Sequence, residues 1–188
     1  QRNEELHIEL EAIEKLLEEC GKTRDARLIM MRLQQFTGVI MAKGFEDTAL
    51  YRYNRLLSLN DVGCNPAKFG WTIEEFHAIN KKRQSKWSAS LNMTSTHDTK
   101  RGEDVRARIN VLSEVPVEFR EHIDKWMYLN AGLKSKIQNK IVPNQNEEYY
   151  IYQTLIGALP FNKEDIFDFS QRLQMHIIKV IREAKEHS

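Results

Sequence analysis

Apolar residues recur at the spacing of an α-helix along most of this chain. Between residues 4 and 20 they repeat every three or four positions, and Gly21 follows as a residue suited to ending a helix. A second helix is predicted over residues 23–36, where the Thr23 hydroxyl can cap the first turn. The chain is therefore expected to open with two helices joined by a short turn.

Capping signals mark where later helices begin. Thr72 is followed three residues on by Glu75, the pattern of a capping box, so a helix is predicted from there to about Lys86. Pro116 suits the first position of another helix. Periodicity further predicts helices over residues 46–59, 102–112, 116–133, 146–159 and 163–187, and a loop rich in Gly, Asn and Pro over residues 60–70.

Two stretches break the helical pattern. Residues 39–42 form an apolar run between Gly38 and Gly44, and residues 88–96 are rich in small and β-forming side chains. We predict each stretch as a strand. Strands joined through helices pair in parallel, but two strands alone do not make a stable parallel sheet. The pattern therefore predicts part of a larger α/β sheet or barrel, and a mostly helical structure if this piece folds by itself.

Composition excludes few classes of protein. Hydrophobic residues make up 41% and charged residues 29% of the 188 residues, and the net charge is +1, which gives no global attraction to nucleic acid or to an anionic membrane. No apolar run approaches the roughly 18 residues of a membrane span. Cys20 and Cys64 lie far apart without metal-type spacing, so free thiols and a cytoplasmic location are expected. The start at Gln1 and the helical pattern at the other end suggest a fragment of a longer protein.

The stretch TSTHDTKRGEDVRARI carries the first candidate site. His97 and Asp98 follow the second predicted strand, and the carboxyl ends of barrel strands are where catalytic side chains gather. A carboxylate there can stabilise cationic charge and accept hydrogen bonds from sugar hydroxyls, while an imidazole can donate one. The alternative is structural, with Asp98 capping the next helix and His97 packing against the protein.

Three other groups have both a functional and a structural interpretation. Lys43, Glu46 and Asp47 follow the first predicted strand, where they form either a ligand-binding edge or the charge bias of a helix start. The stretch LYRYNRLL, residues 50–57, holds aromatic and Arg side chains that suit either sugar contacts or core packing with a surface ion pair. The basic turn NKKRQSKW, residues 80–87, is either a solvated helix end or, less expected, a nucleic-acid contact. Nucleotide-binding loops, zinc motifs and a serine nucleophile elbow are not found in the sequence.

Three longer stretches resemble a known family. TSTHDTKRGEDVRARINVLSE, VIMAKGFEDTALYRYNRLLSLNDVG and YYIYQTLIGALP together are similar to the maltooligosyltrehalose synthases, which belong to the α-amylase superfamily of barrel enzymes. The resemblance covers about residues 30–188. The chain departs from the family pattern at residues 37–40 and 62–66, outside the charged positions.

The resemblance implies both a reaction and the roles of particular residues. Such enzymes convert the reducing-end α-1,4 bond of a maltooligosaccharide to an α,α-1,1 bond, in the manner of a retaining glycosidase and without metal or organic cofactor. The implied catalytic residue is Asp98, as a third carboxylate that stabilises oxocarbenium-like charge. The implied substrate-binding residues are His97, Lys100 and Lys43, the two lysines as candidates to hold the freed glucose.

The resemblance also sets what this piece is expected to lack. The family's nucleophile Asp and acid-base Glu belong to barrel strands that would precede it, so the piece alone is expected to be inactive. The fold class expected is a mainly α fragment of a (β/α)8 barrel enzyme with helical insertions. It would comprise a helical lead-in (1–37), two strand-helix units (38–115) and a helical subdomain (116–188), with the rest of the barrel as its partner. The alternative is a stand-alone helical module that binds carbohydrate or protein; neither nucleic acid nor a membrane is an expected partner.

Overall fold

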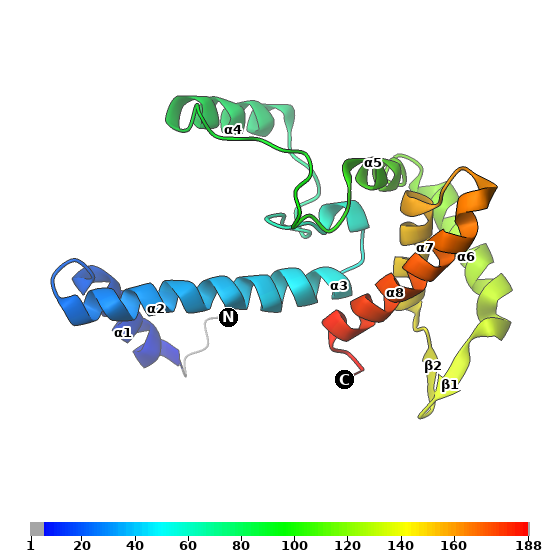
Figure 1. Cartoon of the computed structure of the whole chain (residues 1–188), viewed down its shortest axis with the longest axis horizontal. Coiled ribbons are helices and arrows are strands. Elements are labelled where there is room, and N and C mark those ends of the chain that lie inside the picture. The colour runs from blue at the N-terminus through cyan, green and yellow to red at the C-terminus, as the bar shows by residue number, and fades with distance from the viewer. Residues whose placement is uncertain (1–5, 188) are drawn as a thin grey trace. The chain divides into compact units, whose positions relative to one another are not determined.

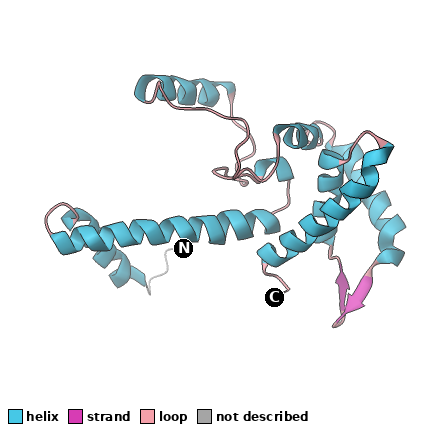
Figure 2. Ribbon diagram, viewed as in Figure 1, coloured by secondary structure: helices cyan, strands magenta, loops and turns pink. Residues whose placement is uncertain are grey.

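The structure, a computed structural model, describes residues 6–187, so residues 1–5 of the predicted lead-in lie outside the described residues. The chain divides into two compact units, residues 1–45 and residues 46–188. Helices dominate both units, and the one sheet among the described residues is a two-stranded hairpin (Figure 2). The prediction of a mainly α structure is confirmed, whereas the division at residues 37/38 and 115/116 stays a prediction.

The first unit is built on a helical hairpin. Helix α1 (His7–Glu19) and helix α2 (Arg24–Ile40) lie against each other, with the turn between them at residues 20–23 (Figure 1). The Thr23 hydroxyl accepts the Ala26 N–H at 3.1 Å, which confirms the predicted cap. Within α2 the buried side chains are Ala26 and Met30.

Helical structure continues where the first strand was predicted. Helix α2 runs through Ile40 and passes directly into a π-helix, η2 (Met41–Ala49), followed by α3 (Leu50–Arg52). The strand prediction for residues 39–42 is therefore wrong. A buried strand needs hydrogen-bonded neighbours and two covered faces, but Val39 and Ile40 are exposed and the described residues supply no adjacent strand. A helix satisfies its own backbone groups, so this apolar run extends α2.

The second predicted strand, residues 88–96, is also not a strand. It is an irregular segment between α4 (Ile73–Lys86) and α5 (Glu103–Val111), and Leu91 is 94% exposed. The physical reason is the same, because no strand among the described residues lies beside it. Helix α4 begins as predicted: the Thr72 hydroxyl accepts the Glu75 N–H, and the Glu75 carboxylate accepts the Thr72 N–H.

The core of the second unit forms where α5, α7 (Gln145–Ala158) and α8 (Ile166–Ala184) come together (Figure 1). The segment from Tyr51 through the 3-10 helix η3 (Leu57–Leu59) adds to it. Helix α6 (Pro116–Asn130) starts with Pro116 as predicted and is followed by η4 (Ala131–Leu133). The buried cluster comprises Tyr51, Leu56, Leu57, Ile109, Leu112, Tyr150, Val180 and Ala184.

A β-hairpin that the sequence analysis did not predict follows η4. Strands β1 (Ser135–Ile137) and β2 (Lys140–Val142) pair antiparallel, with Lys136 opposite Ile141. The turn residues Gln138 and Asn139 both have positive φ, as a two-residue hairpin turn of the type that follows strand twist requires. Helix α7 then starts at the capping residue Asn144, and η5 (Lys163–Asp165) leads into α8. Among residues 6–187, no helix combines the length and apolar character needed to cross a bilayer.

Candidate functional site

His97 and Asp98 lie in a short turn, residues 96–99, that is closed by hydrogen bonds within the turn itself. The Thr99 hydroxyl donates to the Thr96 carbonyl at 2.8 Å, and the Asp98 N–H donates to the Thr96 hydroxyl at 3.2 Å. The His97 Nε2 lies 3.2 Å from Asp98 Oδ2, so the imidazole and the carboxylate form a pair. Their side chains are 90% and 71% exposed, which leaves both open to a ligand.

The structural alternative for this pair is wrong. Helix α5 begins at Glu103 with Gly102 as its N-cap and without a capping side chain, so Asp98 does not cap it. The high exposure of His97 likewise excludes a packing role within the described residues. The first turn of α5 instead fixes the segment before the pair: Glu103 accepts hydrogen bonds from Thr94 Oγ1 at 3.0 Å and Ser95 Oγ at 2.5 Å. Both bonds lower the pKa of Glu103, and the bond from Ser95 has the larger effect.

Lys100 points away from solvent. Its side chain is 11% exposed, its Nζ lies 2.5 Å from Asp47 Oδ1, and it lies 5.1 Å from the centre of the Tyr51 ring. The structure thus brings together Lys100 and Asp47, residues that follow the two segments predicted as strands. Two charges this close and this shielded attract more strongly than an exposed pair.

The charged cluster near residue 44 does not mark a helix start. Lys43, Glu46 and Asp47 all lie inside η2, where the chain is continuously helical from α2 onward, so the interpretation as N-terminal charge bias is wrong. Glu46 Oε1 accepts the Gly63 N–H at 3.2 Å, and Asp47 pairs with Lys100. Lys43 is an exposed residue of the first unit, and its role in binding the substrate stays a prediction.

The aromatic and Arg residues of LYRYNRLL mostly have structural roles. Tyr51 is part of the core, and Arg52 donates from Nε to the Ala184 carbonyl at 2.5 Å and lies 3.7 Å from Glu186. This arrangement matches core packing with a surface ion pair. The basic turn of residues 80–87 is the exposed C-terminal end of α4, where positive side chains complement the helix dipole.

Sequence reasoning missed the residues that hold the His97-Asp98 turn in place. Asp61 is 3% exposed, and its Oδ1 accepts the Lys100 N–H at 3.2 Å. Arg106 of α5 lies 3.6 Å from Asp61 Oδ2 and donates to the Thr94 carbonyl. The local signal was an acidic residue in a turn-rich loop, because the partners that link Asp61 to the turn and to α5, Lys100 and Arg106, lie 39 or more residues away.

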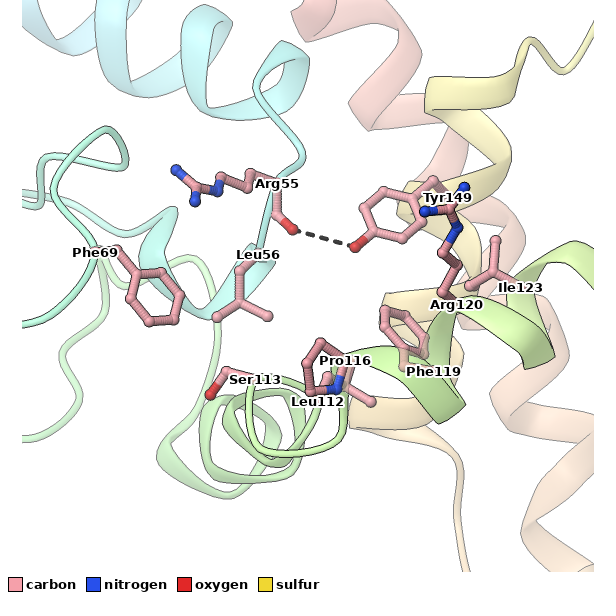
Figure 3. Close-up of a pocket in the computed structure, with 10 residues that line it drawn as sticks. All are labelled: Arg55, Leu56, Phe69, Leu112, Ser113, Pro116, Phe119, Arg120, Ile123 and Tyr149. Carbon is pink, nitrogen blue, oxygen red and sulfur yellow. Dashed lines mark hydrogen bonds between the residues drawn. The ribbon is translucent and has the colours of Figure 1, made fainter.

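A separate pocket of about 440 Å³ opens between the loop after α3 and the helices α5, α6 and α7 (Figure 3). Its lining is largely aromatic and aliphatic, with Phe69, Phe119 and Tyr149 around it. The Tyr149 hydroxyl donates to the Arg55 carbonyl at 3.2 Å across one side. Arg55 and Leu56 of the stretch LYRYNRLL line this pocket, whereas His97, Asp98, Lys100 and Lys43 do not.

Comparison with known proteins gives several clear likenesses, although no family model matches the chain. A Mycobacterium tuberculosis protein that carries the name maltooligosyl trehalose synthase is 40% identical over 159 residues, which is 84% of this chain and 19% of that protein. The solved structure of a hypothetical maltooligosyl trehalose synthase from Sulfolobus tokodaii aligns with a TM-score of 0.74 and 39% identity, over 91% of this chain and 22% of that one. A solved glycosyltrehalose synthase aligns with a TM-score of 0.70 and 47% identity, over 91% and 21%.

These likenesses show that the chain corresponds to one segment of larger proteins, at 39–47% sequence identity. It spans about a fifth of the length of the relatives that it matches. These relatives are named maltooligosyl trehalose synthases, the same family that the three quoted stretches resemble. The alternative of a stand-alone binding module has no support from these comparisons.

Proposed function

We propose that this chain is part of an intramolecular glucan transglycosylase, a (1→4)-α-D-glucan 1-α-D-glucosylmutase of the α-amylase superfamily. The substrate would be a maltooligosaccharide, and the partner of this segment would be the rest of the catalytic barrel, in the cytoplasm. The observation that carries the proposal is the His97-Asp98 pair, presented to solvent on a closed turn in a segment 40% identical to a named synthase.

Asp98 supplies negative charge in this proposal. As the glycosidic bond breaks, positive charge develops on the sugar ring, and a carboxylate fixed beside it stabilises that charge more than it stabilises the neutral substrate. Its two oxygens can also accept hydrogen bonds from ring hydroxyls. His97 is paired with the same carboxylate, so its imidazole can donate to a hydroxyl of the same sugar.

The covalent steps need two further carboxyl groups. A nucleophile forms the glycosyl-enzyme bond while an acid protonates the departing sugar oxygen, and the freed glucose then attacks through its anomeric hydroxyl. We assign these two groups to barrel strands outside this segment. Lys100 and Lys43 are assigned to the acceptor side, where ammonium donors would hold the freed glucose.

The test is Asp98→Asn in a full-length synthase carrying this segment. Asn keeps the shape of the side chain and removes its charge, so we expect kcat to fall below a tenth of normal, a loss of at least about 1.4 kcal/mol in transition-state stabilisation. Asp104→Asn is the matched control, since Asp104 is an exposed acid in the first turn of α5. Asp98→Asn with more than a tenth of normal turnover would refute the assignment. The purified 188-residue chain itself should form no trehalose-ended product from maltopentaose.

A further inference from the structure

The turn that presents His97 and Asp98 has few contacts of its own with the rest of the second unit. The hydrogen bonds within it join Thr96 to Asp98 and Thr99, and the two site side chains pair with each other. Its position relative to the helices therefore depends on the residues at its two ends. Those ends are Thr94 and Ser95 on one side and Lys100 on the other.

Asp61 holds the far end of the turn. Its carboxylate is nearly inaccessible, at 3% exposure, and Oδ1 accepts two backbone N–H groups, from Val62 at 2.7 Å and from Lys100 at 3.2 Å. The Lys100 amide is two residues beyond Asp98. Because a buried carboxylate that accepts backbone N–H groups is costly to displace, this contact fixes where the chain leaves the turn.

Arg106 binds the chain just before the turn, at Thr94 and Ser95, and also forms an ion pair with Asp61. Its Nη2 donates to the Thr94 carbonyl and lies 3.4 Å from Ser95 Oγ, so the same guanidinium grips the chain just before the turn. Its Nη1 lies 3.6 Å from Asp61 Oδ2, an oxygen that has no hydrogen-bond partner among the described residues. The ion pair therefore links the two anchors to each other, with the side chains 24% and 4% exposed.

We propose that Asp61 and Arg106 act as a clamp that positions Asp98: the two side chains pair with each other while each binds one end of the segment from Thr94 to Lys100. Neither side chain pairs with His97 or Asp98, and Asp61 meets Lys100 only at its backbone N–H, so both are positioning residues. The catalytic part of this proposal rests on the proposed function, in which Asp98 must meet the charge that develops on the sugar. The clamp itself rests only on the contacts of the second unit.

The clamp can be tested on the 188-residue chain by amide hydrogen exchange. Asp61→Asn retains an acceptor oxygen but removes the charge that holds Arg106, and Arg106→Gln removes the guanidinium. In either variant we expect exchange across residues 95–100 to accelerate at least tenfold. The matched control is Arg108→Gln on the same helix, because Arg108 donates to the Gly157 and Leu159 carbonyls instead of to the turn. Unchanged exchange in both clamp variants, or an equal acceleration in the control, would overturn the clamp.

The positioning role is tested separately, by kinetics of the full-length synthase. Asp61→Asn and Arg106→Gln should lower kcat at least tenfold with KM within about twofold, and Arg106→Lys, which keeps the charge, should recover part of the loss. If Asp61→Asn and Arg106→Gln accelerate exchange but leave kcat normal, the positioning role is wrong. Failure of the proposed function would show itself differently, as normal turnover by Asp98→Asn, and the exchange data would still decide the clamp.

Discussion

The side-chain carbonyl of Gln153 accepts the backbone N–H of Leu57 at 2.9 Å. The amide nitrogen of the same side chain donates to the Asn54 carbonyl at 2.9 Å, and Gln153 is 0% exposed. One side chain of α7 thus satisfies an acceptor of the irregular segment after α3, at Asn54, and a donor at the start of η3, at Leu57. That segment leads directly to Asp61, so the contact anchors the base of the loop that holds the His97-Asp98 turn.

Gln153→Ala should destabilise the chain strongly. It leaves a buried N–H and a buried C=O without partners, each costing about 1–3 kcal/mol, and opens a cavity as well. We expect the free energy of unfolding, measured in urea, to fall by about 3 kcal/mol or more. Gln171→Ala, at an exposed position of α8, is the control and should change it by less than about 0.5 kcal/mol. Equal, small effects at both positions would contradict the anchoring role.

Gly157→Ala tests the close approach of α5 and α7. A Cβ there would lie 2.8 Å from Val105 Cγ1 and 2.9 Å from Ile109 Cδ1, so the two helices would have to separate or repack. Overpacking of about 1–3 kcal/mol should exceed the gain of roughly 1 kcal/mol that Ala brings to a helix. We therefore expect net destabilisation in urea unfolding, partly relieved by Val105→Ala in the same chain. Gly132→Ala, where a Cβ would meet no atom within 4 Å, is the matched control.

The buried His176 should make the protein less stable in acid. Burial, and then the charges of Arg101 and Lys179, lower the pKa of His176, while its Nε2 lies 2.9 Å from the Tyr150 hydroxyl. The unfolded chain therefore binds a proton more readily than the folded one. The stability that this residue contributes is complete above a pH of about 6.5 and is lost as the pH falls from there through the lowered pKa.

His176→Gln should flatten that part of the pH dependence, measured as the thermal unfolding midpoint between pH 7.5 and about 5. His77→Gln, on the exposed face of α4, should leave the wild-type dependence in place. A variant of His176 with the same acid sensitivity as the wild type would contradict this origin.

Tyr150 should cause a loss of stability at high pH. Burial is the main cause that raises the pKa of Tyr150 to about 12, and Arg101 donates to its hydroxyl at 2.9 Å. Because the folded chain keeps this phenol protonated longer than the unfolded chain, its stabilising contribution is complete below pH of about 10 and declines as the pH rises toward 12. Tyr150→Phe should be less stable at neutral pH and lose less stability between pH 9 and 11.

Lys100→Ala in a full-length synthase tests the acceptor side. If Lys100 holds the freed glucose, its loss should raise the ratio of free glucose to trehalose-ended product at matched conversion. Because Lys100 pairs with Asp47, Asp47→Asn should raise the same ratio less, by loosening the ammonium without removing it. Lys136→Ala on the exposed hairpin serves as the control. An unchanged ratio with normal turnover would leave Lys100 with the ion pair alone.

Much of the helical framework could be predicted because its signals are local. Thr72 and Glu75 cap each other within four residues, and Pro116 fixes a helix start by its own ring. The two strand predictions failed because a parallel strand depends on neighbours, which the described residues do not supply at residues 39–42 or 88–96. The hairpin of β1 and β2 was missed because each strand is only three residues long and Gln-Asn is a weak turn signal.

The candidate site could be predicted only in part, for a related reason. The sequence pointed to His97, Asp98 and Lys100 through one unusual stretch. The residues that support them, Asp61 and Arg106, act across long separations and carry no local pattern. The half-buried pair between Lys100 and Asp47 likewise has no local signal in the sequence, because the two residues lie 53 positions apart.

The turn closed by Thr96 and Thr99 has a thermodynamic consequence for anything that binds to it. Ordering the backbone of one residue costs about 1–2 kcal/mol of conformational entropy, and a loop ordered only by its ligand loses that amount from the affinity. Here the hydrogen bonds within the turn impose the order during folding. A ligand that reaches His97 and Asp98 therefore meets a preorganised backbone, and its affinity for the pair reflects the contacts that it makes rather than the ordering of the chain.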